Sequence, residues 1–323
     1  MSRSQFVHTY DSIISVENLL LAWNEFIKGK KNRKDAQVFQ LRLIDNILSL
    51  HLELKNKTYV HRGYEAFKIS DPKPRDIHKA SVRDRLLHRA IYRKLYPFFD
   101  RTFIPDSFSC RLNKGTHKAF NRFTDFHRKV SKNNTKTIWV LKCDIRKFFA
   151  SVGHDILIGI LKVYISDPNI VQLLNQIINS FPVGLPLGNL TSQLFVNIYM
   201  NEFDQFVKHK LKAKYYIRYA DDFVILSESE SYLENILNRI REFLLERLKL
   251  SLHPNKVSIK TLASGVGYLG WIHFPDHRVL RTATKRRMLK NISDKNRSSY
   301  AGLLKHGHSR RLTALISTGF NQA

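Results

Sequence analysis

Two adjacent aspartates, Asp221 and Asp222, separate two short runs of β-branched and aromatic residues. The runs lie at residues 214–218 and 223–226, and a short acidic break between such runs is typical of a β-hairpin turn. The two carboxylates repel each other, and Arg218 is the obvious cation nearby. A divalent ion that prefers oxygen ligands, such as Mg²⁺, would stabilise the pair. An ordinary solvated turn is the alternative, and these residues alone leave both interpretations open.

The net charge of this chain limits the classes of partner that it can be expected to bind. Its 323 residues include 54 Lys plus Arg against 27 Asp plus Glu, a formal net charge of +27. Because 43% of the residues are hydrophobic, this surplus indicates a folded protein that binds a polyanion. The basic residues are spread among 21 Phe, 13 Tyr and 3 Trp, which favours a nucleic-acid track over a membrane surface. Ribosomal-type structural proteins share this charge, so charge alone does not identify an enzyme.

Cysteine usage and hydropathy exclude several other classes. The two cysteines, Cys110 and Cys143, form no CxxC pair and have no zinc-type spacing with histidine. This usage predicts a reducing, intracellular compartment. No apolar run has the length of a membrane span, and the first residues lack the core of a signal peptide. We therefore expect no membrane partner.

Apolar spacing predicts an α+β chain. An alternating pattern at 59–69 is broken at 71–74 and resumes at 75–77, which predicts a hairpin that carries Lys68 and Arg75. Two cations on this hairpin could reach a triphosphate, and plain surface charge is the alternative. The pattern also predicts helices at 16–27, 36–54, 82–99 (stopping near Pro97), 154–164, up to 181, after 188 and from 231, strands at 137–145, 250–259 and 266–274, and basic helices from 281.

A third carboxylate, Asp144, ends the apolar strand predicted at 137–145. A carboxylate at this position needs a partner, and Lys142 and Arg146 are the nearest cations in the sequence. A strand-end aspartate often caps the helix that follows, which would satisfy it without a metal. Further along, the loop at 182–188 contains two glycines that would let the backbone approach a ligand closely.

Taken in order, these segments resemble the motifs of a reverse transcriptase. Residues 141–149 resemble the first catalytic palm motif, and Tyr219-Ala220-Asp221-Asp222 resembles the second. The fingers motifs are matched by Lys68, Arg75, the Asp84-Arg85 pair and residues 108–115, and the late palm and primer-grip motifs by Lys256 and residues 268–270. The resemblance implies a right-hand polymerase with an N-terminal helical extension (1–58), fingers (59–136), a palm (137–276, with fingers-associated helices at about 154–181) and a short basic helical thumb (277–323).

The resemblance also implies a role for individual residues. Asp144, Asp221 and Asp222 would be catalytic and, with Ile145, would hold two Mg²⁺ ions, for which Mn²⁺ could substitute. Phe149 would exclude the 2′-hydroxyl of a ribonucleotide, whereas a core aromatic is the alternative. The other implied nucleotide-binding residues are Lys68, Arg75, Leu187, Gly188, Gln193 and Lys256, and the implied primer and template contacts are Arg111, Tyr219, Tyr268, Leu269 and Gly270.

One segment narrows the subfamily. Leu187 and Gly188, followed after three residues by Ser192-Gln193, are similar to the variant typical of diversity-generating retroelements. Such enzymes copy a template-repeat RNA into cDNA with frequent errors at adenines. The resemblance implies template RNA, cDNA, dNTPs and a basic, barrel-shaped accessory variability protein as partners. It also implies a cytoplasmic protein that is bacterial or phage-encoded. Ala150 departs from the family, because relatives usually carry an acidic residue there.

Three alternatives remain for the function. The first is a group II intron-like or retron-type reverse transcriptase of ordinary fidelity, the second is an RNA-binding scaffold without catalysis, and the third is an RNA-templated RNA polymerase. Leu187 is relevant to the alternative of ordinary fidelity. The glutamine usual at this position can hydrogen-bond across the nascent base pair, whereas leucine cannot. We expect this enzyme to discriminate less well between correct and incorrect incoming nucleotides opposite some template bases.

Overall fold

The computed structural model describes residues 4–70 and 74–317. The chain forms two compact units that alternate along the sequence. The first unit contains the residues up to Ile104, together with Arg146–Phe206 and Phe243–Ser251. The second contains Pro105–Ile145, Val207–Glu242 and the residues from Leu252 onward. No helix among the described residues combines the length and the apolar character needed to cross a bilayer.

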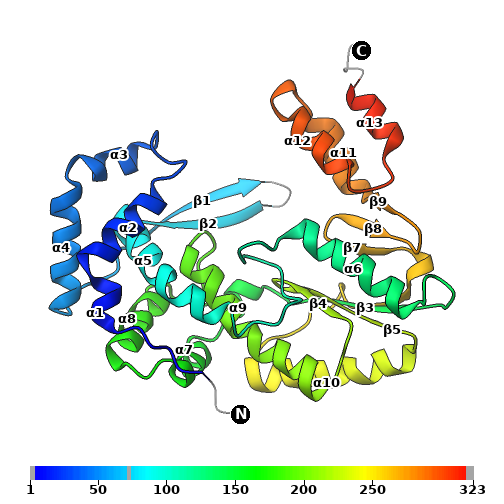
Figure 1. Ribbon diagram of the computed structural model, residues 1–323, viewed down its shortest axis with the longest axis horizontal. Helices are drawn as coiled ribbons and strands as arrows, with labels where there is room; N and C mark the ends of the chain where they lie inside the picture. Colours follow the sequence, from blue (N-terminus) through cyan, green and yellow to red (C-terminus); the bar gives the residue numbers. More distant parts are fainter. Residues whose placement is uncertain (1–3, 71–73, 318–323) are drawn as a thin grey trace. The chain divides into compact units, whose positions relative to one another are not determined.

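The first unit is mainly helical, with α5 (Val82–Phe99) at its centre (Figure 1). This helix packs against α2 (Val16–Phe26) and α9 (Leu190–Gln205), and it buries Leu86, Ile91 and Leu95 completely. An amphipathic helix gains most of its stability from such burial, so the predicted apolar stripes fix these contacts. The other helices of the unit are α1 (Tyr10–Ile14), α3 (Lys34–Leu41), α4 (Leu43–Lys55), α7 (His154–Tyr164) and α8 (Pro168–Asn179).

Two helix predictions in this unit were wrong in detail. The single helix expected at 36–54 is broken at Arg42, whose φ of −124° and ψ of 45° lie outside the helical region. The helix at 82–99 does not stop near Pro97, because α5 continues through it to Phe99. Pro97 lies in the last turn, where it removes only one hydrogen bond of the helix.

The predicted hairpin in the first unit is confirmed. Strands β1 (Tyr64–Ser70) and β2 (Pro74–Ala80) pair in antiparallel fashion from Tyr64 opposite Ala80 to Ser70 opposite Pro74. Most of the break predicted at 71–74 lies outside the described residues. Figure 1 shows the two strands extending away from the helices of the unit.

The second unit is built on a four-stranded antiparallel sheet in the order β4-β5-β3-β6. Its strands are β3 (Trp139–Asp144), β4 (Tyr216–Tyr219), β5 (Asp222–Ser227) and β6 (Ser258–Thr261). Helix α6 (Thr116–Val130) packs on β4 and β5 through Phe123 and Phe126. The strand expected at 250–259 was largely wrong, because residues 250–257 form only an isolated bridge at Leu252 before β6 begins.

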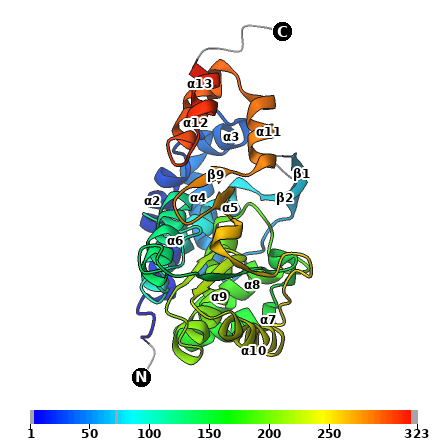
Figure 2. The ribbon, with the colours of Figure 1, turned by 90° about the vertical axis from the view of Figure 1, so that its right-hand side faces the viewer.

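A second, smaller sheet follows in the same unit. Strands β7 (Val266–Tyr268), β8 (Trp271–His273) and β9 (Arg278–Leu280) pair in sequence order, so the predicted segment 266–274 is a hairpin. Helices α11 (Thr282–Asn291), α12 (Asp294–Leu304) and α13 (Arg310–Ser317) come next (Figure 2). They bury Met288 and Leu304 against Trp271 and Phe120. Helix α10 (Glu230–Leu248) begins in the second unit after β5 and ends in the first.

Candidate active site

Strand register brings the predicted carboxylates together in the second unit. Asp144, the last residue of β3, lies directly opposite Asp222, the first residue of β5. Residues directly opposite in antiparallel strands project to the same face, with Cβ atoms roughly 5 Å apart. The third carboxylate belongs to Asp221, whose backbone carbonyl accepts a hydrogen bond from the Ile145 N–H at 3.1 Å. All three therefore come from one end of one sheet.

The turn that holds these residues is tight. Tyr219 pairs with Asp222, so Ala220 and Asp221 form a two-residue hairpin loop. Ala220 has a φ of 56°, in the left-handed region that such turns require. Arg218 is fully buried next to the turn, and its guanidinium donates to the Ala220 carbonyl at 3.1 Å and to Ser107 Oγ at 3.0 Å. These bonds hold the turn from its buried side.

Two lysines compensate part of the negative charge. Lys142 Nζ lies 3.6 Å from Asp222 Oδ2, and Lys256 Nζ lies 2.8 Å from Asp144 Oδ1. Asp144 therefore pairs with a lysine and does not cap a helix. Burial raises the pKa of Asp222 to about 7, with Asp144 and Asp221 adding to the rise and Lys142 opposing it. Asp222 Oδ1 is buried without a hydrogen-bond partner.

The carboxylates of Asp144, Asp221 and Asp222 are suitable ligands for a hard divalent cation. Carboxylate oxygens are the ligands that Mg²⁺ prefers, and the unsatisfied Oδ1 of Asp222 is a coordination position that no protein donor fills. Among the described residues, no three His, Cys, Asp or Glu side chains converge into a group that could hold a metal ion. The carboxylates thus lie together at one end of the sheet without forming a closed coordination shell.

The predicted primer and template residues of the second unit have varied surroundings. Tyr219 Oη accepts a hydrogen bond from Thr116 Oγ1 at 3.2 Å, and Arg111 donates to the Ser107 carbonyl at 3.0 Å. Tyr268 is completely buried in the core formed by α6 and the sheets. Leu269 and Gly270 have φ values of 48° and 86° and form the turn between β7 and β8. Their proposed contacts with primer and template stay predictions.

In the first unit, Lys68 and Arg75 lie on opposite faces of the hairpin. Lys68 is directly opposite Asp76, and Arg75 is directly opposite Ile69. Because successive residues of a strand alternate between faces, these pairs place the two cations back to back. Both side chains are exposed. A triphosphate that contacts both would have to lie along the hairpin edge, which the sequence did not indicate.

The other predicted nucleotide-binding residues of the first unit cluster around one loop. The Leu187 carbonyl accepts a hydrogen bond from the His78 N–H of β2 at 2.9 Å, and a Cβ on Gly188 would lie 2.9 Å from the Ile77 side chain. Phe149 is tied to the same loop, because its carbonyl accepts from the Leu185 N–H at 2.8 Å. Gln193 lies in the first turn of α9. This loop therefore joins β2 to the Phe149 segment.

Sequence reasoning named Lys142 as a possible partner of Asp144, but it missed the pairing of Lys142 with Asp222 and of Lys256 with Asp144. Lys142 shares a strand face with Asp144, two residues away, so its proximity to the site follows from strand alternation. Lys256 was singled out as a nucleotide contact, whereas the structure pairs it with Asp144 from 112 residues away. No local sequence signal predicts that second contact.

Asp144, Asp221 and Asp222 lie within a segment that matches a known family. A family model described as "Reverse transcriptase (RNA-dependent DNA polymerase)" matches residues 68–273. Protein YkfC of Escherichia coli (strain K12) is 25% identical over 266 residues, which cover 69% of this chain and 68% of YkfC. The group II intron-encoded protein LtrA of Lactococcus lactis subsp. cremoris is 24% identical over 319 residues, which cover 75% of this chain and 51% of LtrA. The chain thus spans about half the length of LtrA.

Solved structures resemble the fold as well. Telomerase from Candida albicans, in complex with a TWJ fragment of telomeric RNA, has a TM-score of 0.54 at 12% identity and covers 76% of this chain and 51% of its own. Apo telomerase from Candida tropicalis, truncated from its C-terminal domain, has a TM-score of 0.51 at 14% identity and covers 74% and 60%. This likeness confirms the α+β right-hand polymerase fold that the sequence predicted.

Proposed function

The chain belongs to the reverse transcriptase family, and we propose that it is an RNA-directed DNA polymerase that copies a template RNA into cDNA. The observation that carries this proposal is the pairing of Asp144 with Asp222 beside Asp221, with one buried carboxylate oxygen left unsatisfied. A structural carboxylate would be expected to have all its acceptor positions filled. An open, hard-oxygen site at the end of a sheet suits nucleotidyl transfer.

Asp144, Asp221 and Asp222, with the neighbouring Ile145, would hold the metal ions in this mechanism. Two bound Mg²⁺ ions would supply Lewis-acid activation of the primer 3′-hydroxyl and charge stabilisation at the leaving pyrophosphate. The chain itself fixes the carboxylates through the β3–β5 register. Lys142 and Lys256 balance their charge, which lowers the cost of holding three acidic groups together.

The proposed nucleotide contacts come from the first unit. Lys68 and Arg75 would neutralise the incoming triphosphate, the arginine by its planar fork. Phe149 would contact the sugar and exclude a 2′-hydroxyl. Leu187 and Gly188 would lie near the nascent pair, a role supported by their connection to β2 and hence to Arg75.

Within the family we propose a diversity-generating retroelement enzyme, supported by Leu187-Gly188 and Ser192-Gln193. It would make cDNA with errors at template adenines and act with an accessory variability protein. The relatives that match this chain favour a second candidate, a group II intron-type reverse transcriptase of ordinary fidelity, because LtrA is a group II intron-encoded protein. Fidelity separates the two.

Primer extension tests the polymerase proposal. Purified protein, an RNA template with a DNA primer, dNTPs and Mg²⁺ are expected to give cDNA. Asp222→Asn should reduce the rate by about 10³-fold or more, since metal-assisted charge stabilisation supplies several kcal/mol and 1.36 kcal/mol is tenfold. Asp294→Asn removes the same charge from the exposed start of α12 and should leave the rate unchanged. Absence of cDNA with the wild-type protein would favour the RNA-binding scaffold, and equal cDNA synthesis by wild type and Asp222→Asn would refute the catalytic role of Asp222.

Sequencing of the cDNA tests the subfamily. The retroelement proposal expects frequent substitutions opposite template adenines in wild type and fewer in Leu187→Gln. Accurate wild-type cDNA would favour the intron-type enzyme. Frequent adenine errors that do not change in Leu187→Gln would remove this residue from the explanation and keep the subfamily.

A further inference from the structure

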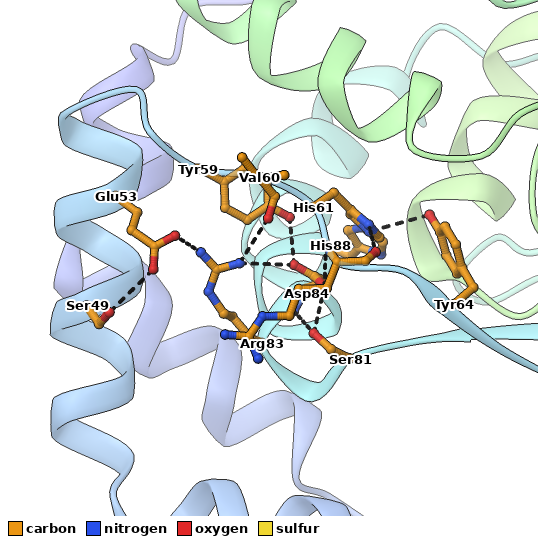
Figure 3. Close-up of polar contacts among 11 residues, drawn as sticks. Ser49, Glu53, Tyr59, Val60, His61, Tyr64, Ser81, Arg83, Asp84 and His88 are labelled. Atoms are coloured by element: carbon orange, nitrogen blue, oxygen red, sulfur yellow. Dashed lines mark hydrogen bonds and ion pairs between the residues drawn. The ribbon is translucent and has the colours of Figure 1, made fainter.

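A buried carboxylate lies at the base of the β1–β2 hairpin. Asp84, in the first turn of α5, has no solvent exposure (Figure 3). Its Oδ1 accepts from Tyr59 Oη at 2.8 Å and from Arg83 Nη1 at 3.3 Å. Its Oδ2 accepts from Ser81 Oγ at 2.6 Å and from the Arg62 N–H at 3.2 Å. Both oxygens are therefore satisfied by donors from within the first unit.

These donors come from both ends of the hairpin. Tyr59 and Arg62 precede β1, which begins at Tyr64. Ser81 follows Ala80, the last residue of β2. Arg83 extends the connection, because its guanidinium also donates to the Val60 carbonyl at 3.3 Å and to Glu53 of α4. One carboxylate thus ties the chain entering the hairpin to the chain leaving it.

Helix capping alone does not account for this arrangement. Ser81 caps α5 and accepts from the Asp84 N–H at 3.2 Å, so a local box of Ser81 and Asp84 would already serve the helix. The bonds from Tyr59 and Arg62 serve a different purpose, because they cross to the opposite end of the hairpin. A buried carboxylate costs stability unless its partners hold it closely, so four donors indicate a fixed junction.

Other contacts also hold the base of the hairpin, because the Leu187 carbonyl accepts from the His78 N–H at 2.9 Å and Lys79 pairs with Asp35 at 3.0 Å, but the outer part of the hairpin is exposed. The side chains from Glu65 to Ser70 and from Pro74 to Asp76 are exposed. Lys68 is four residues from the start of β1 and Arg75 five residues from the end of β2, which places them roughly 14 and 17 Å from the junction at 3.4 Å per residue. A tilt of about 5° at the junction would move Arg75 by about 1.5 Å, which is enough to break a hydrogen bond of about 3 Å to a phosphate oxygen.

We propose that Asp84 is a positioning residue for nucleotide binding, which sets the angle of the hairpin and thereby places Lys68 and Arg75 on the incoming triphosphate. This inference rests on the proposed function of those two cations. Asp84 does not touch the nucleotide and acts through the backbone of β1 and β2.

The substitution Asp84→Asn tests the junction. It keeps the volume of the side chain, but its amide presents a donor where two donors already converge. The expected result is a KM for dNTP raised about tenfold with kcat changed less than threefold, because the variant weakens binding of the triphosphate equally in the ground state and the transition state. Tyr59→Phe removes one bond and keeps the ring, so it should raise KM by about threefold in a protein that still folds.

Asn18→Ala provides a matched control for lost stability. Asn18 is also buried in the same unit, where it donates to the carbonyls of Ile13 and Ala90 at 2.7 and 3.2 Å, neither of which belongs to the hairpin. Hydrogen exchange adds a readout that needs no activity. Asp84→Asn should increase exchange of the β1 and β2 amides, and Asn18→Ala should not.

Double variants decide the outcome. Lys68→Ala and Arg75→Ala should each raise the KM for dNTP, and Asp84→Asn should add little to a chain that carries both. Unchanged KM in Lys68→Ala and Arg75→Ala would refute the triphosphate role and this inference with it. Raised KM in those variants with normal KM in Asp84→Asn would overturn the inference alone. An equal rise in KM in Asp84→Asn and Asn18→Ala would also overturn the inference. So would a rise in KM from Asp84→Asn that is as large in the Lys68→Ala and Arg75→Ala background as in the wild-type background.

Discussion

Gly184 is the position where the structure most closely fixes the effect of a single methyl group. Its φ is +67°, and a Cβ at this residue would lie 2.3 Å from the Phe149 carbonyl oxygen and 2.6 Å from Ala150 Cα. Both contacts are with backbone atoms, which cannot rotate away. The same Phe149 oxygen accepts the hydrogen bond from the Leu185 N–H. Gly184→Ala must therefore push the Phe149 segment away from its loop.

The expected cost can be added from its parts. A contact of 2.3 Å must lengthen by about 1 Å to reach ordinary van der Waals distance, and overpacking of this kind costs about 1–3 kcal/mol. The left-handed backbone of an alanine adds about 1–2 kcal/mol, and loss of the Leu185 bond adds about 1 kcal/mol. The free energy of unfolding should fall by about 3–6 kcal/mol, which a domain stable by 5–15 kcal/mol can partly tolerate.

Two measurements check this prediction. Urea unfolding gives the loss of stability, and single-nucleotide incorporation gives the preference for dATP over ATP. If Phe149 acts at the sugar, a shift of its backbone by about 1 Å should reduce that preference about tenfold or more. The matched control is Gly159→Ala in α7, where a Cβ meets nothing within 4 Å. This control should raise stability by about 0.5–1 kcal/mol and leave the preference unchanged.

Equal stability of Gly184→Ala and wild type would refute the steric reasoning. A destabilised Gly184→Ala enzyme that still prefers dATP as strongly as wild type would separate Phe149 from sugar selection. The structural and functional parts of the prediction can therefore fail independently.

Three further predictions concern the second unit. Acidification from pH 6.5 to pH 4 should lower the free energy of unfolding, because burial lowers the pKa of His273 to about 3 and only the unfolded chain then protonates this histidine. In urea titrations at several pH values, His273→Phe should reduce the slope of the unfolding free energy against pH by up to about 1.4 kcal/mol per pH unit. Arg218→Met removes the bonds to Ala220 and Ser107 and should cost about 3 kcal/mol by the same assay, whereas the exposed Lys214→Met should cost little. Ala220→Gly should gain about 0.5–1 kcal/mol, since glycine relieves its positive φ, and a loss of stability would contradict the turn geometry.

The sequence predicted the hairpins and the centre of the candidate site because their signals are local. Strand alternation on both sides of the Asp221-Asp222 break sets the register of β4 and β5 within a few residues of the turn. The apolar run at 137–145 predicted β3, which spans Trp139–Asp144. The hairpin that carries Lys68 and Arg75 followed from the same period-2 pattern.

Other features depend on contacts that no local pattern encodes. The helix predicted at 36–54 is broken at Arg42, although apolar residues continue at helical spacing on both sides of it. Three of these apolar residues, Val38, Leu41 and Ile44, are exposed. The residues around Leu252 alternate like a strand, yet only one bridge to Ile145 forms. Strand pairing requires a neighbouring edge with free backbone groups, and propensity cannot supply one.

The partners of Asp84 and Asp106 differ from those of Asp222. Asp84 is buried with four donors, and Asp106 pairs with both Arg122 and Lys208 at 2.7 and 3.6 Å. Asp222 is half-buried, and it has Lys142 on one oxygen, whereas its other oxygen is buried without a partner. A fold that surrounds its structural acids with cations could have done the same here at little cost. Stability does not explain the open oxygen of Asp222, whereas a ligand that arrives with its own positive charge does.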